Sequence, residues 1–304
     1  MSTAQRALDS AEHVDAIVAR AGSGAGSPFR AMLRGLRSSP LGLAGVLILV
    51  LLAGFCFLGP VLHPTNQVDV NLLDAALPPG AGHPLGTDTN GFDVLGRLMR
   101  GGQVSLEIGL LAALIATTIG TLYGAVAGLA GGVVDGLMMR LVDVMLSVPF
   151  LFLVLILSAR YHASAVALSL VIGAFSWLVP ARLIRGEVLT LRVREFVLAA
   201  KVMGASRRRL ILRHLIPNAL GVIIVNITFQ VADAVLAVAT LGFLGFGLSY
   251  PATDWGSQLA SGVTYISAGY WWLIYPVGGF IIATVLALNL LADALRDAVG
   301  RRAG

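Results

Sequence analysis

The amino-acid sequence predicts an all-α integral membrane protein that crosses the bilayer six times. Of the 304 residues, 57% are hydrophobic and only 12% are charged, and the mean hydropathy is +0.86. A soluble domain of this length needs more charge to cover its surface. Several apolar runs also approach the roughly 20 residues that a helix needs to cross about 30 Å of hydrocarbon. These features favour a membrane protein over a soluble protein with many buried helices.

The chain begins with a segment that precedes the first apolar run. It mixes charged residues with the Gly- and Ser-rich run 21–28, which is typical of a flexible linker. The apolar run begins at Leu41, too late for a cleaved signal peptide, and continues to Leu62, too long for one. We therefore predict a cytoplasmic tail in residues 1–38, a first span with an outer loop in 39–103, and the main transmembrane domain in 104–300.

Six apolar runs have the length of transmembrane helices. The predicted spans are 41–62, 104–128, 141–157, 163–183, 220–241 and 271–291. The second carries Gly120, Gly124 and Gly128, and small residues at this four-residue spacing let two helices approach closely in lipid. Glycine is also common in membrane helices generally, so the sequence leaves both interpretations open.

The placement of the basic residues predicts the orientation. With the N-terminus inside, the cytoplasmic side receives most arginines, including those of segment 192–213, whereas only Arg97, Arg100 and Arg160 fall outside. Lys and Arg are enriched on the cytoplasmic side of membrane proteins. The aromatic residues of 265–275 agree, because Trp and Tyr gather at the membrane–water boundary. Both termini are therefore predicted to be cytoplasmic.

Two segments on the outer side are not simple spans. The first, 63–103, is rich in Pro and Gly, which predicts turns, and its end at 92–99 has the pattern of a short interfacial helix. His63 and His83 in this segment are candidates for contact with a cationic substrate. Ordinary exposed loop histidines are the favoured interpretation, because no further ligands lie near them in the sequence. The second outer segment is 248–270.

Charged residues within the predicted spans are candidates for function, because they are costly to place in lipid. Asp233 in the fifth span has no obvious local partner. It either lines a translocation path, where it would attract a peptide amino terminus or a cation, or bonds to a neighbouring helix or a partner chain. Arg140 and Asp143 lie three residues apart, a spacing that allows them to pair on one helical face. Glu107 is expected at the outer interface.

The segment 192–217, between the fourth and fifth spans, is predicted to form a helix, a turn and a second helix. Gly204 breaks the first helix, and Ser206 caps a second helix that begins at Arg207. Pro217 opposes continuation of the second helix, which we expect to end before it. The residues predicted to share one face of the first helix are Phe196, Ala199, Ala200 and Met203.

Three consecutive arginines, Arg207, Arg208 and Arg209, occupy the first turn of that second helix. Cations there oppose the helix dipole, each by up to about 1 kcal/mol when exposed. The charge is therefore expected to be offset by anionic lipid head groups or by an acidic partner surface. A loop that only sets membrane topology is the alternative on charge alone.

This segment resembles the EAA loop of importer-type ABC permeases, whose cytoplasmic helices dock onto an ATPase subunit. The family pattern has two alanines, three residues, a glycine, nine residues and a hydrophobic–x–hydrophobic–proline end. This chain matches it with Ala199, Ala200 and Gly204, and then with His214, Leu215, Ile216 and Pro217. The family's peptide-importer branch also has flanking residues like Glu195, Phe196 and Val197 before the alanines and Gly204, Ala205 and Ser206 after them.

One departure from the family pattern is Leu198, which stands where a glutamate often precedes the alanines. Glu195, one helical turn earlier, is then the candidate for the acidic contact. The resemblance implies a set of ATPase-docking residues in this loop. They are Glu195, Phe196, Ala199, Ala200, Met203, Gly204, Ala205, Ser206, Arg207 and Pro217.

Two further blocks are similar to the same branch. Residues 85–101 resemble its first outer loop, and residues 243–256 and 289–297 resemble its C-terminal third. In and beside the first block, Phe92, Gly96 and Gln103 replace residues that are usually Arg, Ser and Arg. The resemblance covers roughly residues 38–300 and is close to the C-type permease subunit of dipeptide, oligopeptide or nickel importers.

The resemblance implies the type I ABC importer permease fold and a non-hydrolytic subunit of the bacterial cytoplasmic membrane. Such a subunit forms half of the translocation pathway for di- or oligopeptides, with nickel or another small solute as the alternative. The implied partners are a second, different permease chain, two ATPase subunits that hold ATP and Mg, and an extracytoplasmic substrate-binding protein.

The sequence itself has no site for nucleotide hydrolysis or metal binding. A P-loop ends in Gly-Lys-Ser/Thr, but the only lysine, Lys201, lies between alanine and valine. The five histidines are scattered and Cys56 is the single cysteine. We therefore expect no cofactor on this chain, and the basic residues beside apolar spans favour membrane topology over nucleic-acid binding.

Two other classes of function remain open on the sequence. One is an ion-coupled secondary transporter with Asp233 as the proton or sodium site, although the sequence has no inverted repeat. The other is a noncatalytic membrane scaffold whose basic loop recruits proteins.

Overall fold

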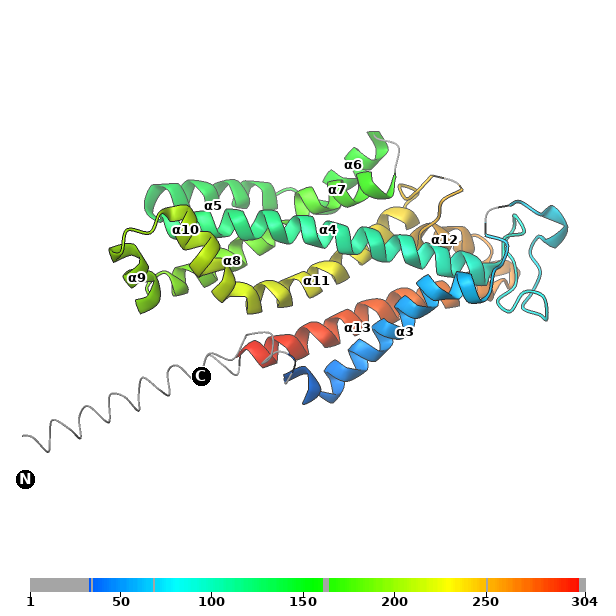
Figure 1. Ribbon diagram of the computed structural model, residues 1–304. Coiled ribbons are helices and arrows are strands. Elements are labelled where there is room, and N and C mark those ends of the chain that lie inside the picture. Colours follow the sequence, from blue (N-terminus) through cyan, green and yellow to red (C-terminus); the bar gives the residue numbers. More distant parts are fainter. Residues whose placement is uncertain (1–32, 34, 68, 161–163, 250, 301–304) are drawn as a thin grey trace, which may run out of the picture.

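The computed structural model describes residues 33, 35–67, 69–160, 164–249 and 251–300, which form an elongated helical bundle (Figure 1). Within these residues there is no β-strand beyond an isolated bridge between Thr87 and Asp93. The segment 192–217 lies at one end of the bundle and the Pro- and Gly-rich outer segment at the other (Figure 1). Most of the predicted tail, residues 1–38, lies outside the described residues.

Four described helices are long and apolar enough to cross a membrane. They are α3 (Pro40–Leu62), α4 (Val94–Ala130), α11 (Ile216–Phe243) together with the turns before it, and α13 (Tyr275–Gly300) together with the turn before it. With two bent helix pairs counted as one span each, the described residues contain six candidate spans. The all-α membrane fold with up to six spans is therefore confirmed.

The bent pairs correct two predicted spans, which are not single straight helices. The third is split into α5 (Gly132–Leu146) and α6 (Phe150–Arg160), whose axes differ by 70°. Pro149 explains the break, because proline lacks an N–H and keeps the preceding residue out of the helical conformation. The fourth is split by a 45° bend into α7 (Ala165–Ser176) and α8 (Leu178–Leu191).

The predicted interfacial helix at 92–99 is also wrong as a separate element, since residues from Val94 onward are the first turns of α4. The Asp93 carboxylate caps this helix by accepting from the Gly96 N–H at 2.9 Å. A helix of 37 residues is about 55 Å long at 1.5 Å per residue, so α4 extends beyond a hydrocarbon layer of about 30 Å.

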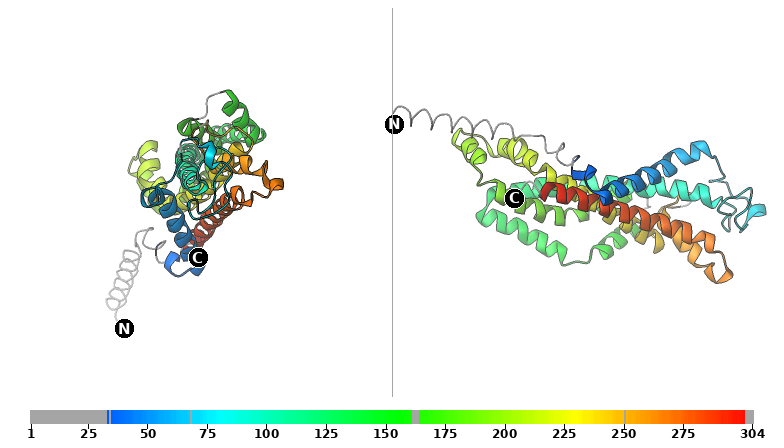
Figure 2. Two further views of the ribbon diagram at one scale, coloured as in Figure 1. Left: turned by 90° about the vertical axis from the view of Figure 1, so that its right-hand side faces the viewer. Right: turned by 90° about the horizontal axis from the view of Figure 1, so that it is seen from below.

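Helix α4 packs against α3, α7, α8 and α11, and the end-on view in Figure 2 shows the other helices gathered around it. Its glycines face α8: a Cβ built at Gly120 would lie 2.8 Å from the carbonyl oxygen of Trp177, and one at Gly124 would overlap the carbonyl oxygen of Ala181. A Cβ at Gly128 would lie 2.8 Å from a Val188 methyl. The glycine stripe therefore allows close helix packing.

The remaining described elements are short and lie at the two ends of the bundle. Helix α12 begins at Trp255, whose buried indole N–H donates to the Leu98 carbonyl at 3.0 Å and whose ring lies beside the buried Cys56. This contact joins the second outer segment to α4. The short elements are η1 (Leu72–Asp74), α9 (Glu195–Val202), α10 (Arg207–Leu210), η2 (Ile211–Leu215), α12 (Trp255–Val263), η3 (Ile266–Ala268) and η4 (Trp271–Leu273).

Candidate functional site

The turn and the cap predicted in segment 192–217 are both present. Helix α9 ends at Val202, and Gly204 adopts φ +79°, the left-handed conformation that glycine accepts without strain. The Ser206 hydroxyl then accepts from the Arg209 N–H at 3.3 Å, so that α10 begins at Arg207 as predicted. The two short helices are thus joined by a tight, well-defined turn.

The predicted shared face of α9 is correct in part. Phe196, Ala199 and Met203 are exposed, with Met203 80% accessible, and they form an apolar face that nothing in the described chain covers. Ala200 instead lies with Val197 in the buried cluster beneath the loop. At about 100° per residue, Ala200 is displaced toward the side of Val197, which explains the difference.

The second helix does not end before Pro217, so this expectation is wrong. The chain passes from α10 through a wide π-type turn, η2, into α11, and residues 207–243 form one continuous helical run. In this turn the Ile216 N–H bonds to the Ile211 carbonyl, and the Asn218 side-chain amide donates to the His214 carbonyl at 2.6 Å. The wide turn accommodates the proline ring and its missing N–H.

Ion pairs join α5 to α8 at the same end of the bundle. The Arg185 guanidinium donates to both carboxylate oxygens of Asp135, at 2.5 and 2.7 Å, and Asp135 is buried. Asp143 pairs with Arg182, not with Arg140 as the spacing suggested, because the two helices lie side by side. These pairs join residues 39 and 50 positions apart, which a search for local spacing cannot find.

Asp233 lies on α11 and lines a cavity of about 350 Å³. The cavity opens between the elbow of α5 and α6, the bend of α7 and α8, and α11. Nearby, the Gln230 side chain donates to the carbonyl of Ser176, the last residue of α7 before the bend, at 2.9 Å. Asp233 has no hydrogen-bond or ion-pair partner among the described residues, and its side chain is exposed on the surface of this single chain.

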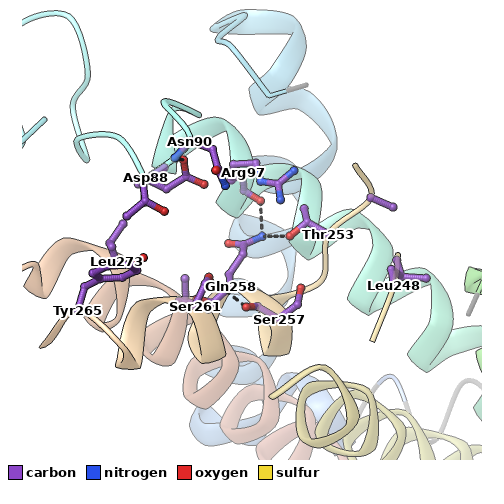
Figure 3. A pocket seen from close by; sticks show the side chains of 14 residues that line it. Asp88, Asn90, Arg97, Leu248, Thr253, Ser257, Gln258, Ser261, Tyr265 and Leu273 are labelled. Atoms are coloured by element: carbon purple, nitrogen blue, oxygen red, sulfur yellow. Dashed lines mark hydrogen bonds between the residues drawn. The ribbon is translucent and has the colours of Figure 1, made fainter. Parts of the chain in front are cut away.

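A second cavity, of about 230 Å³, lies at the outer end of the bundle (Figure 3). Asp88 and Asn90 approach it from the first outer segment, and Ser261 approaches it from α12. The Gln258 amide donates to the Arg97 carbonyl at 2.7 Å and fixes α12 against the start of α4. Sequence reasoning missed this pocket, because its walls come from segments more than a hundred residues apart.

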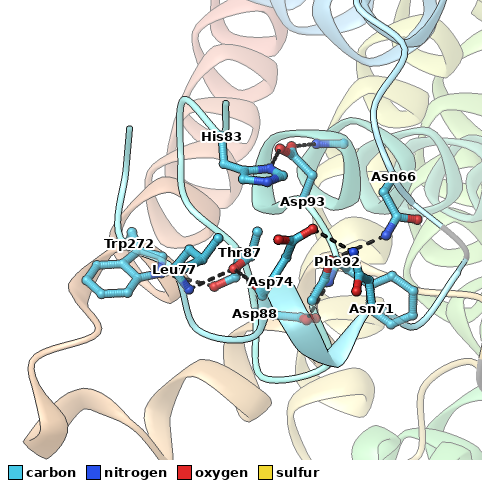
Figure 4. A network of polar contacts seen from close by, with 12 residues as sticks. Asn66, Asn71, Asp74, Leu77, His83, Thr87, Asp88, Phe92, Asp93 and Trp272 are labelled. Atoms are coloured by element: carbon cyan, nitrogen blue, oxygen red, sulfur yellow. Dashed lines mark hydrogen bonds and ion pairs between the residues drawn. The ribbon is translucent and has the colours of Figure 1, made fainter. Parts of the chain in front are cut away.

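A polar network folds the first outer segment onto the start of α4 (Figure 4). The His83 ring lies 2.8 Å from the buried Asp93 carboxylate, so one of its nitrogens is engaged in a structural contact. The Thr87 hydroxyl accepts from the Leu77 N–H at 2.8 Å, and the Trp272 indole donates to the Thr87 carbonyl at 3.2 Å. The structure therefore gives His83 a role in holding the loop.

Comparison with known proteins adds independent findings. Residues 120–304 match the family described as "Binding-protein-dependent transport system inner membrane component", and residues 27–79 match "N-terminal TM domain of oligopeptide transport permease C". The chain is 38% identical over 266 residues to the dipeptide transport system permease protein DppC of Bacillus subtilis, covering 88% of this chain and 83% of that protein.

Two Escherichia coli proteins are similarly close. The oligopeptide transport system permease protein OppC is 40% identical over 258 residues, which is 84% of this chain and 85% of the relative. The probable D,D-dipeptide transport system permease protein DdpC is 37% identical over 271 residues, which is 88% of this chain and 90% of the relative. The similarity thus covers both outer segments, all candidate spans and segment 192–217.

Proposed function

Because the chain belongs to the family of inner membrane components of binding-protein-dependent transport systems, we propose that it forms half of the translocation pathway of an ATP-driven peptide importer. The relatives described above are named for dipeptides and oligopeptides, which supports peptides over nickel as the substrate class. A second permease chain, different from this one, supplies the other half of the pathway.

The exposed apolar face of α9 is the observation that carries this proposal. Phe196 and Met203 are 41% and 80% accessible, and their neighbour Val202 is 89% accessible. An apolar patch of this kind marks a contact surface for a partner. We place a separate ATPase subunit on it, with ATP and Mg held by that subunit.

The docking residues then have different tasks. Phe196, Ala199 and Met203 contact the ATPase subunit, and Glu195 provides the acidic contact. Ala200 supports the loop from inside, because it is buried in the cluster below α9. The residues that shape the loop and begin the next helix are Gly204, Ala205, Ser206, Arg207 and Pro217.

A movement of the docking loop reaches the membrane through α11. The helical run 207–243 has no break between the arginines and Asp233, so a rigid displacement at one end moves the other. Asp233 lines the translocation path in this proposal, and ATP binding by the partner favours one of two arrangements of the path.

In this arrangement both termini and the docking loop are cytoplasmic, and the outer segments face the extracytoplasmic binding protein. The outer segments lie at the opposite end of the bundle from the loop, which supports this assignment (Figure 1). The second cavity, at the outer end of the bundle (Figure 3), is on the side from which peptide would be delivered.

The test is association of the chain with its ATPase subunit in detergent, followed by ATP-dependent peptide uptake in vesicles. Met203→Asp is expected to abolish both, because it places a charge in the centre of an apolar contact. Val133→Asp is the matched control, since Val133 is 88% accessible on α5 and outside the loop. Equal ATPase binding by the two variants would refute docking through α9.

A further inference from the structure

A groove runs between the last turns of α4 and the turns that follow the docking loop. Its volume is about 390 Å³, within the range of roughly 300–1,000 Å³ typical of ligand sites. On α4 its wall is Leu122, Val126 and Leu129, which recur at helical spacing, and Leu212 faces them from η2. Leu122, Val126 and Leu212 are each more than 40% accessible, so this wall is open and apolar.

The same groove has a strongly basic rim. Arg207 and Arg208 line it, and both side chains are exposed. Arg182 and Arg185 pair with carboxylates, whereas among the described residues none of the arginines from 207 to 213 does so. Two guanidinium groups therefore stand beside an apolar wall without a described counter-ion.

The groove lies where α4 ends, at the end of the bundle that carries segment 192–217 (Figure 1). Its apolar wall belongs to the last turns of α4, which ends at Ala130. The Arg192 guanidinium reaches the same end and donates to the Gly128 carbonyl at 2.9 Å. Arginine side chains therefore lie beside the end of α4, with apolar side chains of the same helix next to them.

We propose that this groove binds an anionic phospholipid. The lipid phosphate accepts hydrogen bonds from Arg207 and Arg208, and an acyl chain lies along Leu122 and Val126 of α4. Guanidinium groups bind phosphate through charge-assisted, often bidentate hydrogen bonds. An acidic protein surface would satisfy the charges but would leave the apolar wall without a matching partner, so the combination favours a lipid.

The bound lipid offsets two of the three arginines that begin α10, Arg207 and Arg208, and so helps hold the docking loop in place. The proposal does not depend on which solute is transported. It requires only that this end of the bundle lies at a membrane surface containing anionic lipid, where basic side chains attract the head groups.

The experiment uses the purified full-length chain in detergent, incubated with phosphatidylglycerol or phosphatidylcholine, and measures bound lipid by native mass spectrometry. The wild-type chain is expected to retain phosphatidylglycerol over phosphatidylcholine. Arg207→Gln combined with Arg208→Gln is expected to lower phosphatidylglycerol affinity by about tenfold or more, from the loss of two contacts near the surface. The control, Arg209→Gln with Arg213→Gln, removes the same charge from residues outside the groove and is expected to change affinity less than about threefold.

A second variant tests the apolar wall. Val126→Trp fills the groove without changing its charge and is expected to displace phosphatidylglycerol, with an unchanged size-exclusion profile as the folding control. Equal losses in the two arginine pairs would show diffuse surface charge and overturn the proposal. Equal retention of the two lipids by the wild type would also overturn it and would point to an acidic protein surface. If millimolar inorganic phosphate displaced phosphatidylglycerol and Val126→Trp did not change lipid binding, the groove would be a free-phosphate site and the proposal would be overturned.

Discussion

Asp135→Asn tests the contact that joins α5 to α8 next to the docking loop. The substitution keeps the size of the side chain but removes the charge that Arg185 contacts through two hydrogen bonds, at 2.5 and 2.7 Å. The Asp135 side chain is 10% accessible and that of Arg185 is 33% accessible. The variant therefore leaves a largely buried cation without its counter-charge.

The expected loss of unfolding free energy follows from the burial of this ion pair. Removing one partner of a buried ion pair costs about 3–5 kcal/mol. Because a third of the Arg185 side chain remains open to solvent, we expect a smaller loss of unfolding free energy, roughly 2–3 kcal/mol, at or just below the lower end of that range. Helix α8 runs directly toward α9, so weaker α5–α8 contact also loosens the base of the docking loop.

The assay is thermal denaturation of the purified chain in detergent, followed by the fraction that stays monomeric after heating. Asp143→Asn is the matched control, because the Asp143–Arg182 pair joins the same helices but its side chains are 49% and 50% accessible. An exposed pair contributes about 0–1 kcal/mol. Asp135→Asn should therefore lower the transition temperature more than Asp143→Asn. Equal shifts would refute the argument that the buried Asp135–Arg185 pair stabilises the contact between α5 and α8.

Three further predictions concern the loop, the core and the path. Gly204→Val should weaken binding of the ATPase subunit and lower the unfolding free energy by about 1–2 kcal/mol, because a β-branched residue is strained at φ +79°. Gly204→Asn should be tolerated, because asparagine accepts this conformation more readily, and equal binding by the two variants would contradict this. Gly124→Ala should lower the unfolding free energy by roughly 1–3 kcal/mol, because the new methyl meets the α8 backbone. A methyl at Gly136 would meet open space, so Gly136→Ala should not destabilise the chain, and similar melting curves for the two variants would count against close packing. Asp233→Asn should change peptide uptake by about tenfold with ATPase binding intact, as for a lost charged contact, and unchanged uptake kinetics would remove it from the path.

Local features of the loop were predictable because their causes are local. Gly204 ends α9 through its left-handed conformation, and Ser206 caps α10 with its own hydroxyl. Both effects depend on a residue and its immediate neighbours, so the sequence alone indicates them. The number of apolar runs was predictable for the same reason, since span length depends only on composition over about 20 residues.

The missed features depend on contacts between distant residues. Proline normally ends a helix, but the wide π-type turn η2 accommodates Pro217. Leu210 of α10 and Leu215 of η2 pack into the cluster below α9. Asp143 pairs with Arg182 on α8 and not with Arg140, which is nearer in the sequence, because helix packing brings α8 alongside α5. The outer pocket likewise exists only once α12 meets α4. None of these contacts leaves a local pattern.

The most direct test of the central claim is site-specific cross-linking from the exposed face of α9 in the assembled transporter. Cys56 is buried, so single cysteines introduced at Met203 and at Leu73, which is 92% accessible in the outer segment, can be read separately. Met203→Cys is expected to cross-link to the ATPase subunit and to resist a membrane-impermeant thiol reagent in intact cells, whereas Leu73→Cys is expected to react with that reagent and to form no such cross-link. Labelling of Met203→Cys from outside the cell, or its failure to cross-link to the ATPase subunit, would contradict the account.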